Sequence, residues 1–203
     1  MANQLVTPVG DLYWVRISGD GYDASIINGQ STGESKMQKS ACIRFEKDSA
    51  ECKKLIAMID AEWEEYKKTL KGAPKPKSLG YKPVLDENGN ETNEIEFKFK
   101  TNSFFKDGKP NKVKVLKANG QEIDIGDRLI GNESRGCIHG TMAPYTFAGS
   151  HGISLYLVGI QLTKFVEYAG SLNAQDLSHL SEGDDEPPFD GFDTSNTSSP
   201  DIV

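Results

Sequence analysis

Alternation of apolar and polar residues predicts β-strands along most of the chain. The run "DLYWVRI" (11–17) is aromatic and β-branched, and "ACIRFEK" (41–47) places three apolar side chains on one face. "EIEFKFK" (94–100) alternates in the same way, and "KVKVL" (112–116) follows it after a turn-like "KDGKP". The runs "GCIHGTMAPYTF" and "GISLYLVGIQLTKFVEY", joined by "AGSHG", predict two long strands. Both faces of the second are largely apolar, which predicts a central strand.

One segment has helical spacing instead. Asp48 is its predicted N-cap, and Glu51 stands three residues later, as in a capping box. Gly72 and Pro74 mark the predicted end of the helix. The apolar positions recur every three or four residues and form one stripe, as expected for a helix that packs on a core. The stripe consists of Cys52, Leu55, Ile56, Ile59, Trp63, Tyr66 and Leu70.

This order of elements predicts a mainly β protein built on a five-stranded Greek-key barrel, the OB-fold, with one helix after the third strand. A Gly- and Ser-rich loop around a short strand separates 11–17 from 41–47. Residues 73–93 are predicted to be a loop, with a turn at Asn88-Gly89. The pair 94–100 and 112–116 is then an inserted β-hairpin. A different mixed α+β sheet is the alternative.

Charge divides the chain into a mildly basic body and an acidic tail. The formal net charge is −7, but residues 165–203 hold nine acids and no Lys or Arg, which leaves 21 acids against 23 bases in residues 1–164. The predicted domain is 1–180. Residues 181–203 are too acidic and too poor in apolar side chains to fold alone, so we predict a disordered tail. Its predicted partner-binding residues are Asp184, Asp185, Glu186, Phe189 and Phe192.

The sequence lacks the common motifs of enzymes and metal proteins. It has no Walker loop, no Rossmann fingerprint and no H-E-x-x-H. "DENGNETNEIEF" fails as a calcium loop at the required glycine and at the twelfth position, and Cys137, His139 and His151 have no second ligand pair for zinc. We therefore predict no enzyme activity, cofactor or metal. The three cysteines indicate reduced thiols, and no signal peptide or membrane span is evident, which predicts a cytoplasmic protein.

Lysines interleaved with aromatic residues favour binding of single-stranded nucleic acid, which needs cations for phosphates and flat faces for unstacked bases. The densest segment is "KFKTNSFFKDGKPNKVKVLK" (98–117). If Phe97 and Phe99 face the core, Lys98 and Lys100 point outward on the same strand. Lys112 and Lys114 share one face of the predicted partner strand, which would make a basic ribbon with Phe104 and Phe105 near its tip. The alternative is a solvated lysine face on a hairpin. The predicted single-stranded DNA (ssDNA) residues are Trp14, Arg16, Lys36, Lys39, Lys98, Lys100, Phe104, Phe105, Lys112, Lys114, Arg135, Tyr145 and Tyr156.

Residues 136–170 resemble tailed-phage ssDNA-binding proteins of the podophage replication type. The resemblance rests on Gly136, Pro144-Tyr145, Gly152-Ile153-Ser154, Gln161 and Lys164, and on the strand-then-helix block "ACIRFEKDSAECKKLIAMIDAEWEEY". It implies an OB-fold that coats ssDNA in phage replication and recombination within the infected bacterial host. It also implies an acidic tail that ends in an aromatic residue and recruits replication proteins such as a DNA polymerase or helicase. Here Phe189 and Phe192 are internal, and "TSNTSSPDIV" follows them.

Three functions are compatible with these sequence features. The first is a sequence-tolerant ssDNA-binding protein whose tail competes with DNA for the basic surface and recruits partners. The second is a protein-interaction module, such as a phage adaptor or inhibitor, that binds no nucleic acid. The third is an enzyme of an unrecognised family. The first explains the basic body, the interleaved aromatic residues and the acidic tail together, and it is compatible with a homodimer.

Overall fold

A computed structural model describes residues 3–27, 29–72, 74–126 and 128–168. The acidic tail and the predicted domain boundary at residue 180 lie outside these residues. The tail residues singled out above, Asp184, Asp185, Glu186, Phe189 and Phe192, therefore remain sequence predictions.

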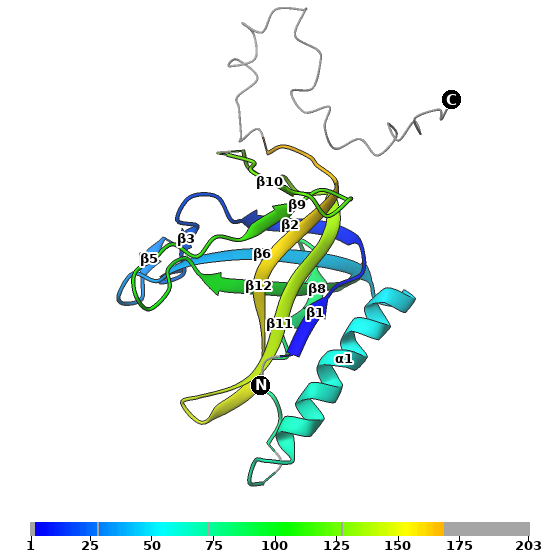
Figure 1. Cartoon of the computed structure of the whole chain (residues 1–203). Helices are drawn as coiled ribbons and strands as arrows, with labels where there is room; N and C mark the ends of the chain where they lie inside the picture. Colours follow the sequence, from blue (N-terminus) through cyan, green and yellow to red (C-terminus); the bar gives the residue numbers. More distant parts are fainter. Residues whose placement is uncertain (1–2, 28, 73, 127, 169–203) are drawn as a thin grey trace, which may run out of the picture.

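A closed barrel of five strands forms the centre of the fold (Figure 1). Its strands are β2 (Gly10–Arg16), β6 (Met37–Glu46), β8 (Glu91–Asn102), β11 (Ser134–Phe147) and β12 (Ser150–Lys164). They pair in the order β11-β2-β6-β8-β12, and the antiparallel β11–β12 pairing closes the ring. The only parallel pair within the ring joins β12 to β8, with Tyr156 opposite Lys100. This arrangement confirms the predicted five-stranded OB-fold barrel.

Short strands extend this sheet at its margins. β1 (Asn3–Val6) pairs with β11, and β3 (Tyr22–Asp23) pairs with β6. β4 (Ile26–Ile27) and β5 (Gln30–Ser31) form a small ribbon of their own. β9 (Lys114–Leu116) runs parallel to β12, and β10 (Glu122–Ile123) pairs with β9.

The inserted hairpin differs from the predicted one. β8 forms a hairpin with β7 (Tyr81–Leu85), which lies in the segment predicted to be a loop, and Asp86 accepts hydrogen bonds from the backbone of Asn88 and Asn90 in the turn. The predicted pairing of 94–100 with 112–116 is wrong, because β9 pairs with β12 and β10 instead. The predicted basic ribbon with Lys112 and Lys114 on a partner strand of β8 therefore does not form.

The helix α1 (Ala50–Lys67) begins one residue later than predicted, because Ser49 and not Asp48 is the N-cap. The Ser49 hydroxyl accepts a hydrogen bond from the Cys52 backbone N–H at 3.2 Å. The predicted apolar stripe is confirmed: four of its residues are buried and the other three pack against the core. α1 follows β6, the predicted third strand, and in the barrel it connects the second strand to the third, since β3, β4 and β5 lie outside the ring.

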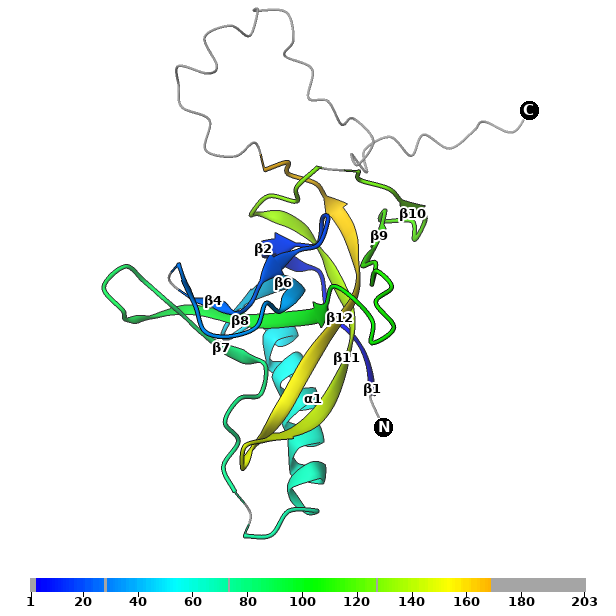
Figure 2. The ribbon, with the colours of Figure 1, turned by 90° about the vertical axis from the view of Figure 1, so that its left-hand side faces the viewer.

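The core lies inside the barrel and between the barrel and α1. Phe97 and Phe99 from β8 are fully buried, as predicted, and Leu55 and Trp63 from α1 are 1% and 4% exposed. α1 packs against β11, β12 and β6, and Figure 2 shows the long β11–β12 hairpin lying alongside it. Within the described residues no helix has the length and apolar character needed to cross a membrane. All three cysteines are buried and free of disulfides.

Helix packing makes a direct prediction about stability. Leu55→Ala removes buried methyl groups between α1 and the barrel, and we expect it to lower the free energy of unfolding by about 2–5 kcal/mol. Met58→Ala on the same helix is the control, since Met58 is 37% exposed and should cost much less. Urea denaturation of both variants measures the difference. Equal destabilisation by the two substitutions would contradict the described packing of α1.

Candidate nucleic-acid interface

An open groove of about 1320 Å³ crosses the outer face of the barrel. Its floor comes from β8 and β12, including the neighbours Lys100 and Tyr156. One wall comes from the connection between β2 and β6, and the opposite wall from the tip of the β11–β12 hairpin and from residues 77–82. Residues 104–106 and 111 complete it. OB-folds bind oligonucleotides on this part of the barrel, between the first connection and the last.

Positive charge gathers in this groove. Six lysines line it, all with exposed side chains, and the only acidic residue in the lining is Glu96. Lys98 and Lys100 alternate with buried Phe97 and Phe99 on β8, which places both lysines on the outer face. The lining lysines are Lys36, Lys77, Lys82, Lys98, Lys100 and Lys106.

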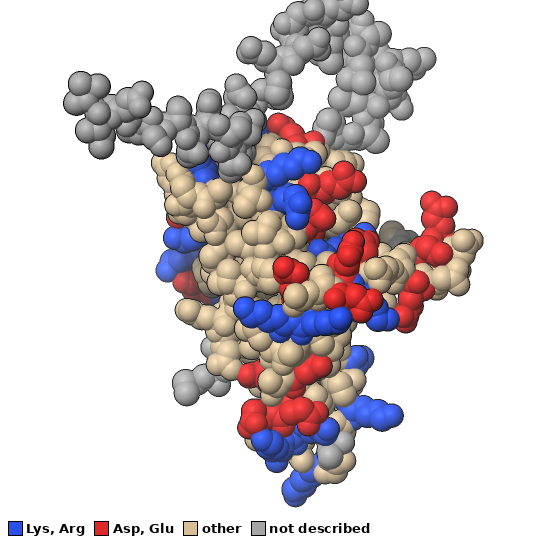
Figure 3. All heavy atoms as spheres, turned by 90° about the vertical axis from the view of Figure 1, so that its right-hand side faces the viewer, with Lys and Arg blue, Asp and Glu red and all other residues tan. Residues whose placement is uncertain are grey.

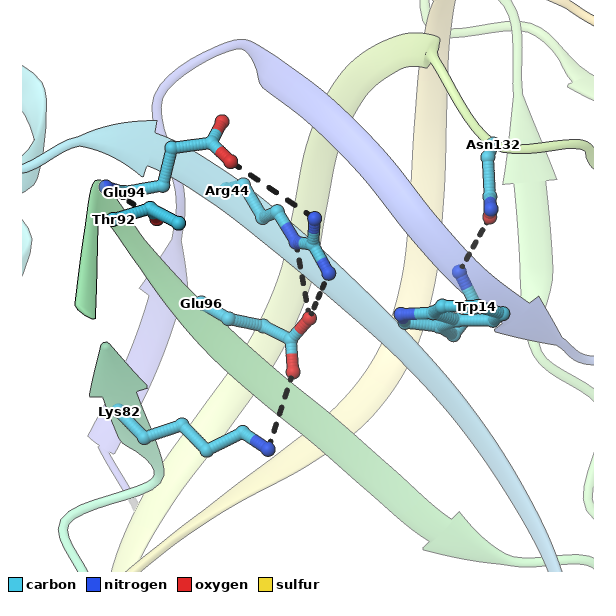
Figure 4. Close-up of polar contacts among 7 residues, drawn as sticks. All are labelled: Trp14, Arg44, Lys82, Thr92, Glu94, Glu96 and Asn132. Carbon is cyan, nitrogen blue, oxygen red and sulfur yellow. Dashed lines mark hydrogen bonds and ion pairs between the residues drawn. The ribbon is translucent and has the colours of Figure 1, made fainter. Parts of the chain in front are cut away.

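The one carboxylate is neutralised from within the barrel wall. Glu96 is 6% exposed, and its Oε2 accepts hydrogen bonds from the Arg44 Nη2 at 2.9 Å and Nε at 3.1 Å (Figure 4). The Arg44 guanidinium also lies 4.0 Å from the centroid of the Tyr13 ring. Lys82 stands 3.9 Å from the other carboxylate oxygen of Glu96. The negative charge of Glu96 therefore reduces the positive potential of the surrounding lysines only slightly.

The surroundings of Lys100 disfavour its charged form. Burial first, and then the nearby charges of Lys36 and Lys98, lower the pKa of Lys100 below its ordinary value. A phosphate beside Lys100 would favour the charged form, because the two charges are opposite. The charge of the groove is thus complementary to a polyanion.

Aromatic rings share the groove with the lysines. Phe105, Tyr156 and Phe147 are 56%, 41% and 76% exposed, which leaves ring faces open to solvent. Tyr81 is more constrained: its hydroxyl donates a hydrogen bond to Asp60 at 2.9 Å, and burial with this bond raises its pKa. The aromatic lining consists of Tyr22, Tyr81, Phe104, Phe105, Tyr145, Phe147 and Tyr156.

Residues 103–111 form a tight loop that presents Phe104 and Phe105. The Asn111 side chain donates to the Thr101 hydroxyl and to the Asn102 carbonyl, and the Ser103 hydroxyl donates to the Asp20 carbonyl. The Lys39 ammonium donates to the Asn111 carbonyl at 3.1 Å. These bonds fix the base of the loop against β6, so the two phenylalanines project from an anchored segment.

The tip of the β11–β12 hairpin is tied to the helix and to the strap formed by residues 77–80. Tyr66 of α1 and Thr146 share a hydrogen bond of 2.7 Å between hydroxyls, and Thr146 in turn contacts His151 Nδ1 at 2.9 Å. The strap adds to β12, where the Ile153 N–H donates to the Ser78 carbonyl. A Cβ on Gly152 would lie 2.8 Å from the Tyr145 ring, so this glycine lets the ring lie against the strand.

The structure brings seven of the predicted ssDNA residues into one groove and leaves six outside its lining. Lys36, Lys98, Lys100, Phe104, Phe105, Tyr145 and Tyr156 line the groove. Trp14 and Arg16 line a separate pocket, and Lys39 is buried beneath the 103–111 loop, where burial lowers its pKa. Lys114 forms an ion pair with Glu122, and Arg135 one with Asp11. Lys112 is exposed and lies beside Lys39, and the charge of Lys112 also lowers the pKa of Lys39.

Sequence analysis missed a second part of the groove. Lys77 and Lys82 lie in or next to β7, and Tyr81 is on β7 itself, in a segment predicted to be a loop. The alternation of Tyr81, Pro83 and Leu85 is the available signal, but the turn at Asn88-Gly89 favours a loop. Tyr22 lies in the two-residue strand β3, inside the loop predicted between 17 and 41, and Phe147 is the last residue of β11.

The face drawn in Figure 3, which is the right-hand side of Figure 1, shows no comparable charge separation, because it mixes Lys and Arg with Asp and Glu. Exposed ion pairs are also present along α1, such as Lys67 with Glu64 and Lys68 with Glu65. In the part of the chain that the structure describes, no group of three or more His, Cys, Asp or Glu side chains is arranged to hold a metal ion.

Comparison with solved structures finds similar folds among phage proteins. The crystal structure of gp2.5, an ssDNA-binding protein of bacteriophage T7, matches with a TM-score of 0.61 at 16% identity, covering 87% of this chain and 93% of that one. The ssDNA-binding protein of bacteriophage Enc34 in complex with ssDNA matches with a TM-score of 0.55, also at 16% identity, covering 83% and 90%. No protein-family model and no curated protein matches the chain. The resemblance inferred from the sequence is thus confirmed at the level of the fold.

The Arg44–Glu96 pair yields a prediction. Arg44→Met leaves the buried Glu96 carboxylate without its main partner, and we expect the free energy of unfolding to fall by about 3–5 kcal/mol. The control is Arg135→Met, which breaks an exposed pair with Asp11 and should cost no more than about 1 kcal/mol. Chemical denaturation checks both values. A small, equal loss in the two variants would show that Glu96 does not need Arg44.

Proposed function

We propose that the chain is a sequence-tolerant ssDNA-binding protein and that ssDNA lies in the groove over β8 and β12. The single observation that carries this proposal is the convergence of six exposed lysines and seven aromatic residues in one groove whose only acid is already paired. Phosphates and bases need these two kinds of group.

The proposed mechanism uses two interactions. Lysines such as Lys98 and Lys100 bind the backbone phosphates and release condensed counterions. Exposed rings such as Phe105 and Tyr156 stack on unpaired bases. The bases of a duplex would first have to give up their stacking on one another, so this interaction favours single strands. Every base has a π-face, so stacking tolerates any sequence. Coating of this kind protects ssDNA without a catalytic group.

The structural comparisons support this proposal. The T7 protein is an ssDNA-binding protein by its description, and the Enc34 protein has been solved with ssDNA bound. We propose the same class of ligand here, and a role in phage DNA replication and recombination in the cytoplasm of the infected host. A protein-interaction module without nucleic-acid binding is the alternative, and the experiments below separate the two.

The acidic tail is proposed to compete with DNA and to recruit partners such as a DNA polymerase or helicase. Seven carboxylates lie between residues 182 and 203, with no Lys or Arg among them. A polyanion tethered to a cationic groove acts at an effective concentration in the mM range. DNA would displace it, and the displaced segment would then be available to partner proteins.

Loss of two groove lysines should weaken binding in a salt-dependent way. We expect Lys98→Ala/Lys100→Ala to lower affinity for oligo-dT and to make the log–log salt dependence shallower by about 1.4, at about 0.7 per phosphate contact. Fluorescence anisotropy of a labelled oligonucleotide measures both quantities.

The matched control for this charge change is Lys53→Ala/Lys68→Ala. Both lysines are exposed, lie outside the groove and form ion pairs with exposed acids. This variant should bind like the unmodified chain. If the two double variants lose affinity equally, the groove is not the binding site. If the unmodified chain binds no oligo-dT at low salt, the interaction module becomes the better account.

Deletion of residues 182–203 should tighten ssDNA binding, because it removes the tethered competitor. The difference should be largest at low salt and should shrink as salt rises, since salt weakens interactions between exposed charges. Anisotropy titrations of the full chain and of a chain ending at Ser181 make the comparison. Equal affinity of the two chains at low salt would rule out competition by the tail.

A further inference from the structure

A second, smaller pocket lies at the end of β2, separate from the lysine groove. It measures about 290 Å³ and is lined by residues from the end of β2 and the turn after it, by the segment 129–132 and by Tyr168. Three apolar or aromatic side chains on its rim are open to solvent: Trp14 is 52% exposed, Leu129 42% and Tyr168 54%. The volume is slightly below the range of small-molecule sites, which favours a single inserted side chain as the ligand.

The backbone holds Trp14 outward in an unusual conformation. Its φ is +52°, in the left-handed region that a bulky residue rarely adopts, and the pairing of β2 with β6 is interrupted between Tyr13 and Arg16. The backbone N–H of Trp14 donates a hydrogen bond to the Asn132 side-chain oxygen at 3.0 Å, which fixes this conformation (Figure 4). Strain of this kind persists where the surrounding structure enforces it, and it often marks functional positions.

The charge of the pocket suits a peptide with one carboxylate near its aromatic ring better than a run of phosphates. Among the described residues that line it, Arg16 is the only charged one, whereas the groove has six lysines. The Arg16 guanidinium lies 5.2 Å from the centroid of the Tyr22 ring, and Tyr22 lines the groove. The pocket and the groove are therefore adjacent, with Arg16 between them.

The chain itself supplies a matching segment. Tyr168, the last described residue, forms part of the pocket, and residues 169–203 follow it in the sequence. Phe189 and Phe192 are the only aromatic residues beyond Tyr168, and Asp190 and Asp193 follow them directly. Phe189 is 21 residues from Tyr168, and an extended chain of that length reaches roughly 70 Å, more than enough to return to the pocket.

We propose that the segment 189–192 of the same chain docks in this pocket, with a phenylalanine against Trp14 and a neighbouring aspartate at Arg16. The contact anchors the acidic residues 182–193 next to the lysine groove. This inference concerns a site outside the proposed DNA interface, and it stands or falls in the absence of DNA.

Acrylamide quenching of tryptophan fluorescence tests the proposal. Trp63, the only other tryptophan, is 4% exposed and shielded, so the quenchable signal reports Trp14. In the full chain without DNA, Phe189→Ala/Phe192→Ala should raise the quenching of Trp14 to the level of a chain ending at Ser181. Ile202→Ala, another apolar residue of the tail, is the matched control and should leave quenching unchanged.

A synthetic peptide of residues 182–203 provides the second measurement. We expect the peptide to protect Trp14 from acrylamide quenching in the chain ending at Ser181. Calorimetry should detect binding of the peptide to that chain, and no binding when the chain also carries Trp14→Gly. Glycine adopts positive φ without strain and keeps the N–H that donates to Asn132, so this variant should fold.

Four results would overturn the proposal. The first is equal quenching in the full chain and in Phe189→Ala/Phe192→Ala. The second is equal peptide binding with and without Trp14, which would place the tail elsewhere, for example in the groove. The third is protection of Trp14 that grows with protein concentration, which would assign the pocket to a second copy. The fourth is protection of Trp14 by oligo-dT when Phe189→Ala/Phe192→Ala leaves the quenching unchanged, which would assign the pocket to DNA.

Discussion

Closure of the barrel depends on β12, which pairs with β11 along its length and with β8 at a single parallel position. That position joins Tyr156 to Lys100, so the closure that completes the core also places a ring beside a cation on the outer face. The approach is close: a Cβ on Gly140 would lie 2.5 Å from the Tyr156 carbonyl and 2.9 Å from the Phe99 ring. Glycine at this position lets the strands and the buried ring meet.

The groove depends on this closure for its floor and on separate anchors for its walls. Lys39 and Asn111 fix the loop with Phe104 and Phe105, while Tyr66 and Thr146 tie the β11–β12 tip to α1. These hydrogen bonds thus position exposed rings, which reduces the entropy lost when a flexible ligand binds. Lysines need no such anchoring, because they act on phosphates mainly through charge.

Much of the fold could be predicted from the sequence because β6, β8, β11, β12 and α1 have clear periodicity. The pairing of 112–116 could not, since its partner residues in β12 lie 45 positions further along and local alternation carries no information on partners. Lys39 is a predicted ssDNA residue that does not line the groove. It is buried because β6 is covered on both faces from Gln38 to Ile43. The positive φ of Trp14 has no sequence signal, because glycine is the residue expected there.

The central claim is that ssDNA lies across β8 and β12 between the loop 103–111 and the β11–β12 tip. Photo-crosslinking of an oligo-dT of about 30 nucleotides to the full chain, followed by mass spectrometry of the linked peptides, tests it most directly. Crosslinks at groove residues such as Phe105, Tyr145 and Tyr156 are the predicted result. Efficient crosslinks confined to Trp14 or to α1, with the groove unlabelled, would contradict it.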